Sequence, residues 1–307
     1  MKIRRNYSLK KLSTIKVGGN AEYFISAGSE SEISEAIATA RTLKVKWTLI
    51  GAGSNIVPSD NGFAGLVIRN VIRSFGVRKN TATVGAGNDL LTFIRTINSF
   101  GLAGMEHMAG IPGTIGGAIY GCAGAYGQEI KDTLKRVRIF DGKEFRWLSN
   151  KQCLFSYRDS IFKRKKDWVI IAAEFSFRRG EAKQLRKISA DTIAIRNEKF
   201  PPLLNCPGSF FKNIVLADLK PANRKRLTAK IDAAKIRGGK VPAGYLLKLA
   251  GAPGMRSGGI RVASYHGNII YNPGGGTSRD IRRLTELLKR RVKQRFGIEL
   301  EEEIQYI

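Results

Sequence analysis

Residues 110–118 read Gly110-Ile111-Pro112-Gly113-Thr114-Ile115-Gly116-Gly117-Ala118, and a second glycine-rich run follows as Gly124-Ala125-Tyr126-Gly127. A third run, Gly51-Ala52-Gly53-Ser54-Asn55, lies earlier in the chain. Closely spaced glycines let backbone amides approach a ligand and turn several N–H groups onto one anion. Any one of these runs is explained more simply as a tight turn between strands, but their combination favours a binding site for a pyrophosphate.

The run at residues 51–55 follows a predicted buried strand, Trp47-Thr48-Leu49-Ile50, which superficially suggests a dinucleotide-binding fingerprint. The third glycine of that fingerprint is absent, and Pro58 interrupts the helix that should begin there. Val84-Gly85-Ala86-Gly87 has the same defect. The glycines therefore predict a pyrophosphate site that does not use a Rossmann helix.

Helices and strands alternate along the chain, and we predict the α+β fold class. Apolar residues at helical spacing predict helices at residues 29–44, 88–100, 181–197 and 278–296. Alternating apolar residues predict a long strand over Trp168–Arg178, with one apolar face made of Val169, Ile171, Ala173, Phe175 and Phe177. A strand-like run, Ile298–Ile307, ends the chain, and Pro201-Pro202 marks a candidate domain boundary.

The composition is that of a globular protein of one large domain or two, because the chain has 307 residues and 43% of them are hydrophobic. No apolar run reaches the roughly 18 residues that span a bilayer, and no hydrophobic signal segment follows the basic N-terminus. Cys122, Cys153 and Cys206 are widely spaced and show no metal-ligand pattern. These features predict a cytoplasmic protein with reduced thiols, no membrane span and no metal site.

The net charge of +28 is the most unusual bulk property, and basic residues cluster at residues 224–240 and 279–295. Such clusters can bind nucleic acid or an anionic membrane. No recognised nucleic-acid motif accompanies them, so we favour a solvated basic surface that also attracts phosphorylated small molecules. His107 and His266 are the only histidines, which gives little support to a Ser-His-Asp hydrolase, and both are expected to be structural.

Six motifs in order resemble the UDP-N-acetylenolpyruvoylglucosamine reductase family over essentially the whole chain. Thr14–Ala21, Gly51–Asn55 and Gly110–Thr114 are similar to its flavin-binding half. Three more segments resemble its catalytic motifs, namely Tyr157-Arg158-Asp159-Ser160, Gly208-Ser209-Phe210-Phe211-Lys212-Asn213 and Leu300-Glu301-Glu302-Glu303-Ile304. The resemblance implies an enzyme that uses non-covalent FAD, with NADPH as co-substrate, to reduce a UDP-linked enolpyruvyl sugar in peptidoglycan precursor synthesis.

The same resemblance implies an architecture and a set of cofactor contacts. An FAD-binding domain of the p-cresol methylhydroxylase type would cover residues 1–184, and a C-terminal α+β substrate domain would cover residues 185–307. The last strand would contribute to the active site of a monomer. The expected cofactor-binding residues are Gly51, Ala52, Gly53, Ser54, Asn55, Gly110, Ile111, Pro112, Gly113, Thr114, Gly116, Gly117, Ala118, Gly124 and Tyr126.

Arg158, Ser209 and Glu303 are the catalytic residues that the resemblance implies. A guanidinium fork suits a carboxylate, so Arg158 would stabilise the charge that develops on the substrate, although a salt bridge with Asp159 is the simpler structural role. Ser209 would donate a proton to carbon, where position alone suggests a turn or cap residue. Glu303 would assist that proton transfer, but alternation along a strand cannot separate it from Glu301.

Lys212 and Asn213 would contact the phosphates and the uridine of the substrate, with surface or turn roles as the alternative. Departures from the family pattern include Cys122, Pro207 and Glu302, none of which removes a catalytic residue. Two other functions stay open on the sequence alone. One is a flavin oxidase acting on a hydroxy acid, in which Ser209 and Glu303 would have no role, and the other is a basic nucleic-acid-binding protein.

Overall fold

The computed structural model describes residues 1–307, which form two compact units. The first unit comprises Met1–Tyr7, Ala21–Gly53 and Phe63–Pro201, and the second comprises Ser8–Asn20, Ser54–Gly62 and Pro202–Ile307. The boundary between the two units in this part of the chain therefore lies between Pro201 and Pro202. The division into an FAD-binding domain that ends at residue 184 and a substrate domain that begins at residue 185 stays a prediction. Two short segments from the first part of the chain, Ser8–Asn20 and Ser54–Gly62, belong to the second unit through their tertiary contacts. No change in composition along the sequence predicts this.

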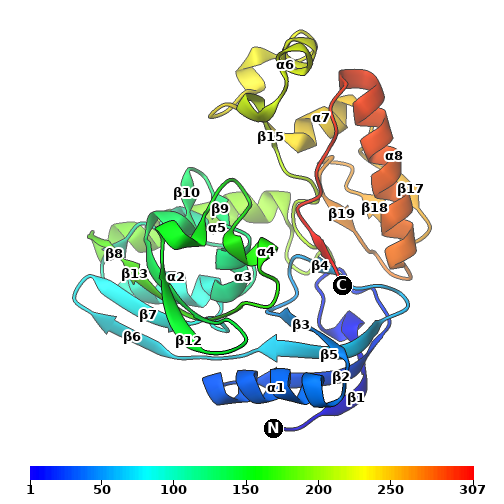
Figure 1. Cartoon of the computed structure of the whole chain (residues 1–307). Helices are drawn as coiled ribbons and strands as arrows, with labels where there is room; N and C mark the ends of the chain where they lie inside the picture. Colours follow the sequence, from blue (N-terminus) through cyan, green and yellow to red (C-terminus); the bar gives the residue numbers. More distant parts are fainter. The chain divides into compact units, whose positions relative to one another are not determined.

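The first unit begins with a small sheet covered by one helix (Figure 1). Its strand order is β1 (Arg4–Ser8), β2 (Asn20–Ala27), β5 (Phe63–Asn70) and β3 (Lys46–Ile50), and β5 pairs in parallel with both β2 and β3. Helix α1 (Glu30–Thr42) buries Ile33, Ala36, Ile37 and Ala40 on this sheet. Ser29 caps the helix by accepting a hydrogen bond from the N–H of Glu32 at 3.1 Å, as its position before an apolar stripe predicts.

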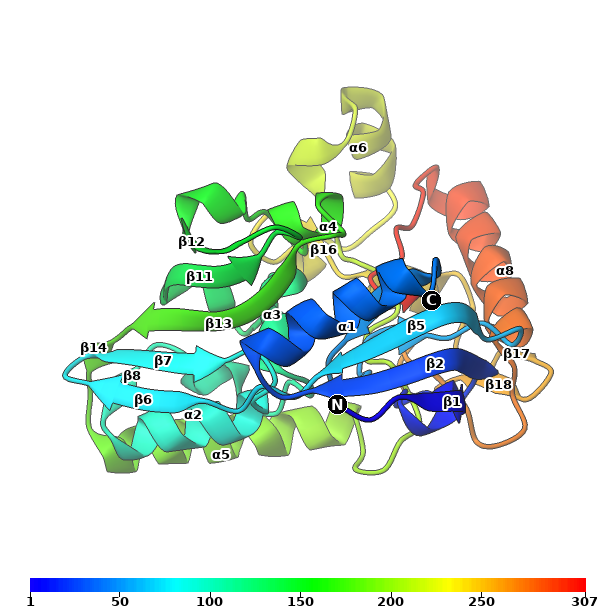
Figure 2. The ribbon, with the colours of Figure 1, turned by 60° about the horizontal axis from the view of Figure 1, so that its bottom comes forward.

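A five-stranded antiparallel sheet completes the first unit (Figure 2). Its order is β12 (Phe145–Ser149), β11 (Leu134–Phe140), β13 (Val169–Ser176), β7 (Thr81–Gly85) and β6 (Phe75–Arg78). Helices α2 (Leu90–Ser99) and α5 (Ala182–Lys199) lie side by side and contribute to its core. The expectation of one apolar face on β13 is wrong, because its residues from Val169 to Phe175 are all buried and side chains from both of its faces enter hydrophobic cores.

The second unit packs around the apolar face of helix α8 (Ser278–Phe296). Ile281, Leu284, Leu288 and Val292 are fully buried on that face, as the helical spacing predicts. Around it lie α6 (Pro221–Thr228), α7 (Ala243–Leu249), the pair β15 (Ile214–Val215) and β16 (Lys240–Val241), and the small sheet β17 (Arg256–Ser257), β18 (Ile260–Val262) and β19 (Ile270–Tyr271).

The C-terminal run is not the continuous strand that its alternation suggests. Glu302 forms an isolated antiparallel bridge with Phe211, and β20 (Gln305–Tyr306) then pairs in parallel with β4 (Ile56–Val57). The chain therefore changes partner within a few residues, and only its tertiary neighbours decide where it does so. The remaining α-helices and β-strands are α3 (Ile115–Tyr120), α4 (Ile161–Arg164), β8 (Leu102–Ala103), β9 (Gly124–Ala125), β10 (Gln128–Glu129) and β14 (Arg178–Arg179).

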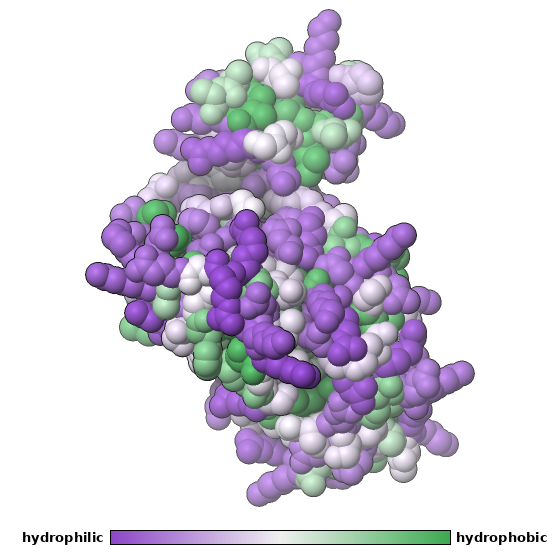
Figure 3. All heavy atoms as spheres, turned by 90° about the vertical axis from the view of Figure 1, so that its left-hand side faces the viewer, coloured by the Kyte–Doolittle hydropathy of each residue, from purple (hydrophilic) through white to green (hydrophobic).

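Figure 3 shows one face on which hydrophilic side chains dominate and hydrophobic atoms appear in small, separated patches. None of the helices combines the length and the apolar character that crossing a membrane requires.

Asp60 links two segments of the second unit that lie far apart in the sequence. Its carboxylate accepts hydrogen bonds from the backbone N–H groups of Ser278 at 2.8 Å and Arg279 at 3.0 Å, at the start of α8. Burial raises the pKa of Asp60, but these hydrogen bonds outweigh that effect and leave the pKa below its usual value. The ionised carboxylate is therefore the form that stabilises the start of α8.

We expect Asp60→Asn to lower the free energy of unfolding by about 1 kcal/mol at neutral pH. Because the folded-state pKa is depressed, the Asp60 contribution is fully present above the unfolded-state pKa and disappears as the pH falls through the folded-state value. Urea unfolding of the two proteins from neutral to acidic pH measures this, and the difference should shrink on acidification. The exposed Asp218→Asn is the control. A difference that stays constant with pH would contradict the assignment.

Candidate active site

A cavity of about 160 Å³ in the first unit brings together two of the glycine-rich runs. Gly51 and Ala52 of the first run and Thr114 of the second line it, together with Arg69, Asn70, Val71, Arg73, Gly87 and Asp89. Pockets for whole drug-sized ligands begin at roughly 300 Å³, so this cavity suits a charged fragment such as a diphosphate. The sequence predicted that these runs meet, and in this cavity they do.

The residues lining this cavity fit the diphosphate of FAD in shape and charge. A Cβ atom on Gly51 would lie 2.4 Å from Oγ1 of Thr114, so a larger residue here would clash with the Thr114 side chain. Arg69 is the second-last residue of β5, and Arg73 lies three residues beyond the end of that strand. Neither arginine forms an ion pair with an acidic side chain. Asp89 also lines the cavity, but its carboxylate accepts hydrogen bonds from the N–H and the hydroxyl of Thr92. The sequence did not predict a role for these two arginines, because they lie outside the glycine-rich runs and look like the many other basic residues of the chain.

Residues 115–118, the second half of the glycine-rich run at 110–118, form the start of helix α3. The backbone N–H groups of Ile115, Gly116 and Ala118 donate to backbone carbonyls, and that of Gly117 donates to Oγ1 of Thr114 at 3.2 Å. These groups hold α3 against its neighbours and do not point at a ligand. Contacts of Gly116, Gly117 and Ala118 with a cofactor stay predictions, and if they exist they do not use these N–H groups.

Gly51→Ala is expected to weaken FAD binding by about tenfold, since the new methyl group displaces the Thr114 hydroxyl that caps α3 and narrows the cavity. Equilibrium titration of FAD into the cofactor-free protein, followed by flavin fluorescence, measures the change. Gly76→Ala is the matched control, because a Cβ atom there meets nothing within 4 Å. Equal affinity in Gly51→Ala and the wild type would remove this cavity from the cofactor site.

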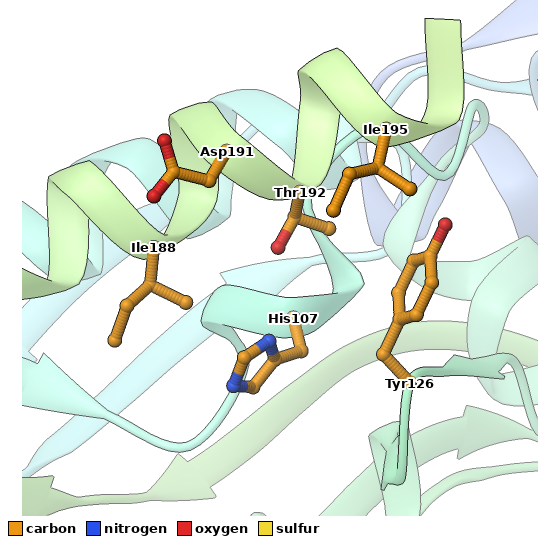
Figure 4. A pocket seen from close by; sticks show the side chains of 6 residues that line it. All are labelled: His107, Tyr126, Ile188, Asp191, Thr192 and Ile195. Atoms are coloured by element: carbon orange, nitrogen blue, oxygen red, sulfur yellow. The ribbon is translucent and has the colours of Figure 1, made fainter. Parts of the chain in front are cut away.

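Tyr126 lies on a second cavity, not on the first. This cavity of about 370 Å³ is lined by His107, Tyr126, Ile188, Asp191, Thr192 and Ile195. Figure 4 shows His107 and Tyr126 on one side and the side of helix α5 opposite them. Tyr126 adopts a left-handed backbone conformation with φ of 49° and is 52% exposed, so the loop holds its ring at the surface. Its contact with the flavin stays a prediction.

Arg158 is held against the glycine-rich run at residues 124–127. Its guanidinium donates to the backbone carbonyls of Cys122 at 3.2 Å and Gly124 at 2.7 Å, and its backbone is left-handed with φ of 54°. Asp159 forms its ion pair with Arg164 at 2.5 Å. Burial raises the pKa of the Cys122 thiol to about 11, so Cys122 stays a neutral residue in this loop. The two carbonyl contacts orient the Arg158 guanidinium.

Two of the predicted catalytic segments pair with each other in the second unit. The N–H of Glu303 donates to the carbonyl of Phe210 at 2.8 Å, and the N–H of Lys212 donates to the carbonyl of Glu301 at 2.9 Å. This antiparallel pairing sets residues 301–303 beside the residues that directly follow Ser209. Segments about ninety positions apart in the sequence thus place the Ser209 and Glu303 motifs together.

Asn268 positions the serine segment, and sequence analysis did not single it out. Its buried amide donates to the carbonyl of Phe211 at 2.8 Å and accepts from the N–H of the same residue at 2.8 Å. The N–H of Phe210 donates to the carbonyl of Asn268 at 3.0 Å. Phe210 and Phe211 are themselves buried, so the half-buried Ser209 sits at the end of a rigid segment. Only the spacing His266-Gly267-Asn268 could have signalled a turn here.

The acidic residues near the C-terminus face different partners. Glu301 pairs with Lys212, and Glu302 pairs with Lys289 of α8 at 2.5 Å. The side-chain carbonyl of Asn213 accepts a hydrogen bond from the N–H of Ala243 at 3.1 Å, at the start of α7. Lys212 and Asn213 therefore have structural contacts, and their contacts with substrate stay predictions.

Ser54 and Asn55 belong to the second unit, whereas Gly51, Ala52 and Gly53 belong to the first. The amide of Asn55 donates to the backbone carbonyl of Glu303 at 3.1 Å, which ties this loop to the C-terminal motif. His266 accepts a hydrogen bond from the N–H of Asn268 at 3.2 Å. Among the residues of the chain, no group of three or more His, Cys, Asp or Glu side chains is arranged to hold a metal ion.

The fold and the phosphate-sized cavity agree with the comparison to protein families. Residues 21–144 match the model of an FAD binding domain, and residues 201–307 match the model described as UDP-N-acetylenolpyruvoylglucosamine reductase, C-terminal domain. The class is therefore an FAD-dependent oxidoreductase, built from an α+β flavin domain of the p-cresol methylhydroxylase type followed by a second α+β domain.

Comparisons over the whole chain identify the family. A UDP-N-acetylenolpyruvoylglucosamine reductase from Solibacter usitatus is 46% identical over 95% of this chain and 92% of its own length. A Bacillus cereus protein of the same name is 32% identical over 98% of this chain and 93% of its own length. The crystal structure of the reductase from Thermus caldophilus matches with a TM-score of 0.77 and 26% identity, over 100% of this chain and 99% of that one. The chain belongs to the UDP-N-acetylenolpyruvoylglucosamine reductase family.

Proposed function

We propose that this chain reduces UDP-N-acetyl-3-O-(1-carboxyvinyl)-glucosamine to UDP-N-acetylmuramate, with FAD as cofactor and NADPH as co-substrate, in peptidoglycan precursor synthesis. The pairing of residues 210–212 with residues 301–303 is the observation that carries the proposal. A flavin oxidase acting on a hydroxy acid would have no use for a serine motif paired with this glutamate motif. Family membership supports the same reaction.

The first unit holds the cofactor in this proposal. Gly51, Ala52 and Thr114 would surround the FAD diphosphate, with Arg69 and Arg73 supplying the opposing charge. When bound, FAD would supply the hydride for the terminal carbon of the substrate. We propose residues 1–184 as the segment that binds FAD and residues 185–307 as the segment that binds the UDP-sugar.

The catalytic residues act on charge and protons. Arg158, which is oriented by the carbonyls of Cys122 and Gly124, would bind the substrate carboxylate and stabilise the negative charge that hydride addition leaves there. Ser209 would donate the proton to the neighbouring carbon from the end of a rigid segment, and Glu303 would support that transfer. Lys212, three residues after Ser209, would bind the diphosphate of the substrate after its ion pair with Glu301 breaks.

The proposed partner is a small molecule, and we propose a monomer that works in the cytoplasm without binding nucleic acid. The basic residues would then serve to attract the doubly phosphorylated substrate. Titration with an oligonucleotide at rising salt distinguishes the alternative, because binding through phosphate contacts falls steeply with salt.

The decisive experiment reduces the flavin of the purified protein without oxygen and then adds the carboxyvinyl sugar. Re-oxidation of the flavin, with formation of UDP-N-acetylmuramate, is the expected result. UDP-N-acetylglucosamine, which lacks the carboxyvinyl group, is the control and should leave the flavin reduced. A flavin that stays reduced with both sugars would overturn the proposal.

A further inference from the structure

Arg196 is a half-buried cation whose side chain lacks an acidic partner. It lies near the C-terminal end of α5, and its Nε atom is buried without a hydrogen-bond partner. Its guanidinium carbon lies 5.5 Å from the centre of the Phe200 ring, and no carboxylate forms an ion pair with it. Removing a guanidinium from water without a compensating anion is costly, so an uncompensated arginine indicates a ligand.

The surroundings of Arg196 are those of the proposed active site in the first unit. A Cβ atom on Gly110 would lie 3.1 Å from Cδ and 3.4 Å from Nε of Arg196, so this glycine makes room for the arginine stem. Figure 4 shows the preceding residue, Ile195, on the same cavity as Tyr126. Arg196 thus lies against the run that contains Gly110, and its neighbour Ile195 lines the cavity that Tyr126 also lines.

Arg158 contacts the glycine-rich run that contains Tyr126. Burial lowers the pKa of the Arg196 guanidinium, the neighbouring Tyr126 hydroxyl raises it, and the positive charge of Arg158 lowers it further. Arg158 also donates to the carbonyl of Gly124, two residues before Tyr126, and Tyr126 lines the same cavity as Ile195 of α5. The acidic residues of the adjacent segments are engaged elsewhere, Asp191 with Lys187 at 2.8 Å and Asp159 with Arg164 at 2.5 Å. Neither of these carboxylates forms an ion pair with Arg196.

We propose that Arg196 is a second binding residue for the substrate carboxylate and that it forms, with Arg158, a subsite made of two guanidinium groups. This inference rests on the proposed function. The enolpyruvyl carboxylate gains negative charge during reduction, and two fixed cations stabilise that charge better than one. Arg196 thereby also discriminates the carboxyvinyl sugar from UDP-sugars that lack a carboxylate.

The test compares two ligands on Arg196→Met and on wild-type protein, both loaded with oxidised FAD. The dissociation constant of each ligand is read from the change in flavin absorbance. Affinity for the carboxyvinyl sugar should fall about 10- to 100-fold, the size of one lost charge-assisted hydrogen bond. Affinity for UDP-N-acetylglucosamine should stay unchanged. Arg186→Met, which removes an exposed arginine from the same helix, should leave both affinities unchanged.

Each other outcome overturns the inference. Equal weakening of both ligands would make Arg196 a diphosphate contact, and unchanged affinity for both would make it structural. If Arg196→Met does not fold or does not hold FAD, Arg196→Lys is measured in the same way. Lysine keeps the charge without the guanidinium fork, so selective weakening for the carboxyvinyl sugar is again expected. Failure of the wild type to bind or reduce that sugar would instead refute the proposed function.

Discussion

In Ser209→Ala we expect reduction of the flavin by NADPH to proceed at nearly the wild-type rate, while transfer to the carboxyvinyl sugar slows by about 10²–10⁴-fold. The first half-reaction needs no proton from Ser209, whereas the second leaves a substrate carbanion that must be protonated. The segment after Ser209 is anchored by buried Phe210 and Phe211, so removal of one hydroxyl should not disturb it. Anaerobic stopped-flow absorbance of the flavin measures each half separately.

Substrate affinity is the second observable for Ser209→Ala. It should change little, because the hydroxyl acts mainly in the transition state. Ser257→Ala, which alters another half-buried serine of the second unit, is the control and should affect neither half-reaction. Equal slowing of both halves would assign Ser209 to the fold or to the flavin, and no slowing would place the proton donor elsewhere.

Glu303→Gln should lower turnover by about 10²–10³-fold, far more than Glu301→Gln or Glu302→Gln. The structure gives the three positions different partners. Glu301 is 71% exposed and pairs with Lys212, while Glu302 pairs with Lys289 on α8. The N–H of Glu303 donates to the carbonyl of Phe210, and the carbonyl of Glu303 accepts from the Asn55 amide. The backbone of Glu303 is therefore fixed next to the residue that follows Ser209.

The two neighbouring substitutions serve as controls that separate stability from catalysis. Glu302→Gln should lower the melting temperature through loss of its ion pair, with turnover close to that of the wild type. Glu301→Gln frees Lys212 and should alter substrate affinity more than turnover. Steady-state kinetics and thermal unfolding of all three variants give the comparison. Similar losses of turnover in all three would identify a structural acidic segment and remove Glu303 from the mechanism.

The local elements of this protein could be predicted with few errors. Helices α1 and α8 lie where their apolar spacing and capping residues place them. These predictions succeed because helix periodicity and caps depend on residues within a few positions of each other. The predictions for β13 and for the C-terminal run failed in part, since burial of both faces and a change of strand partner depend on distant segments.

The sequence alone determined the family, the glycine-rich runs and the order of the motifs, because these are properties of residue identity and spacing. Only the tertiary structure decided that Gly51 and Thr114 share one cavity with Arg69 and Arg73. It also decided that residues 301–303 pair with residues 210–212. Likewise, only burial makes Arg196 an uncompensated cation, since an arginine on a helix looks the same in sequence whether water or protein surrounds it.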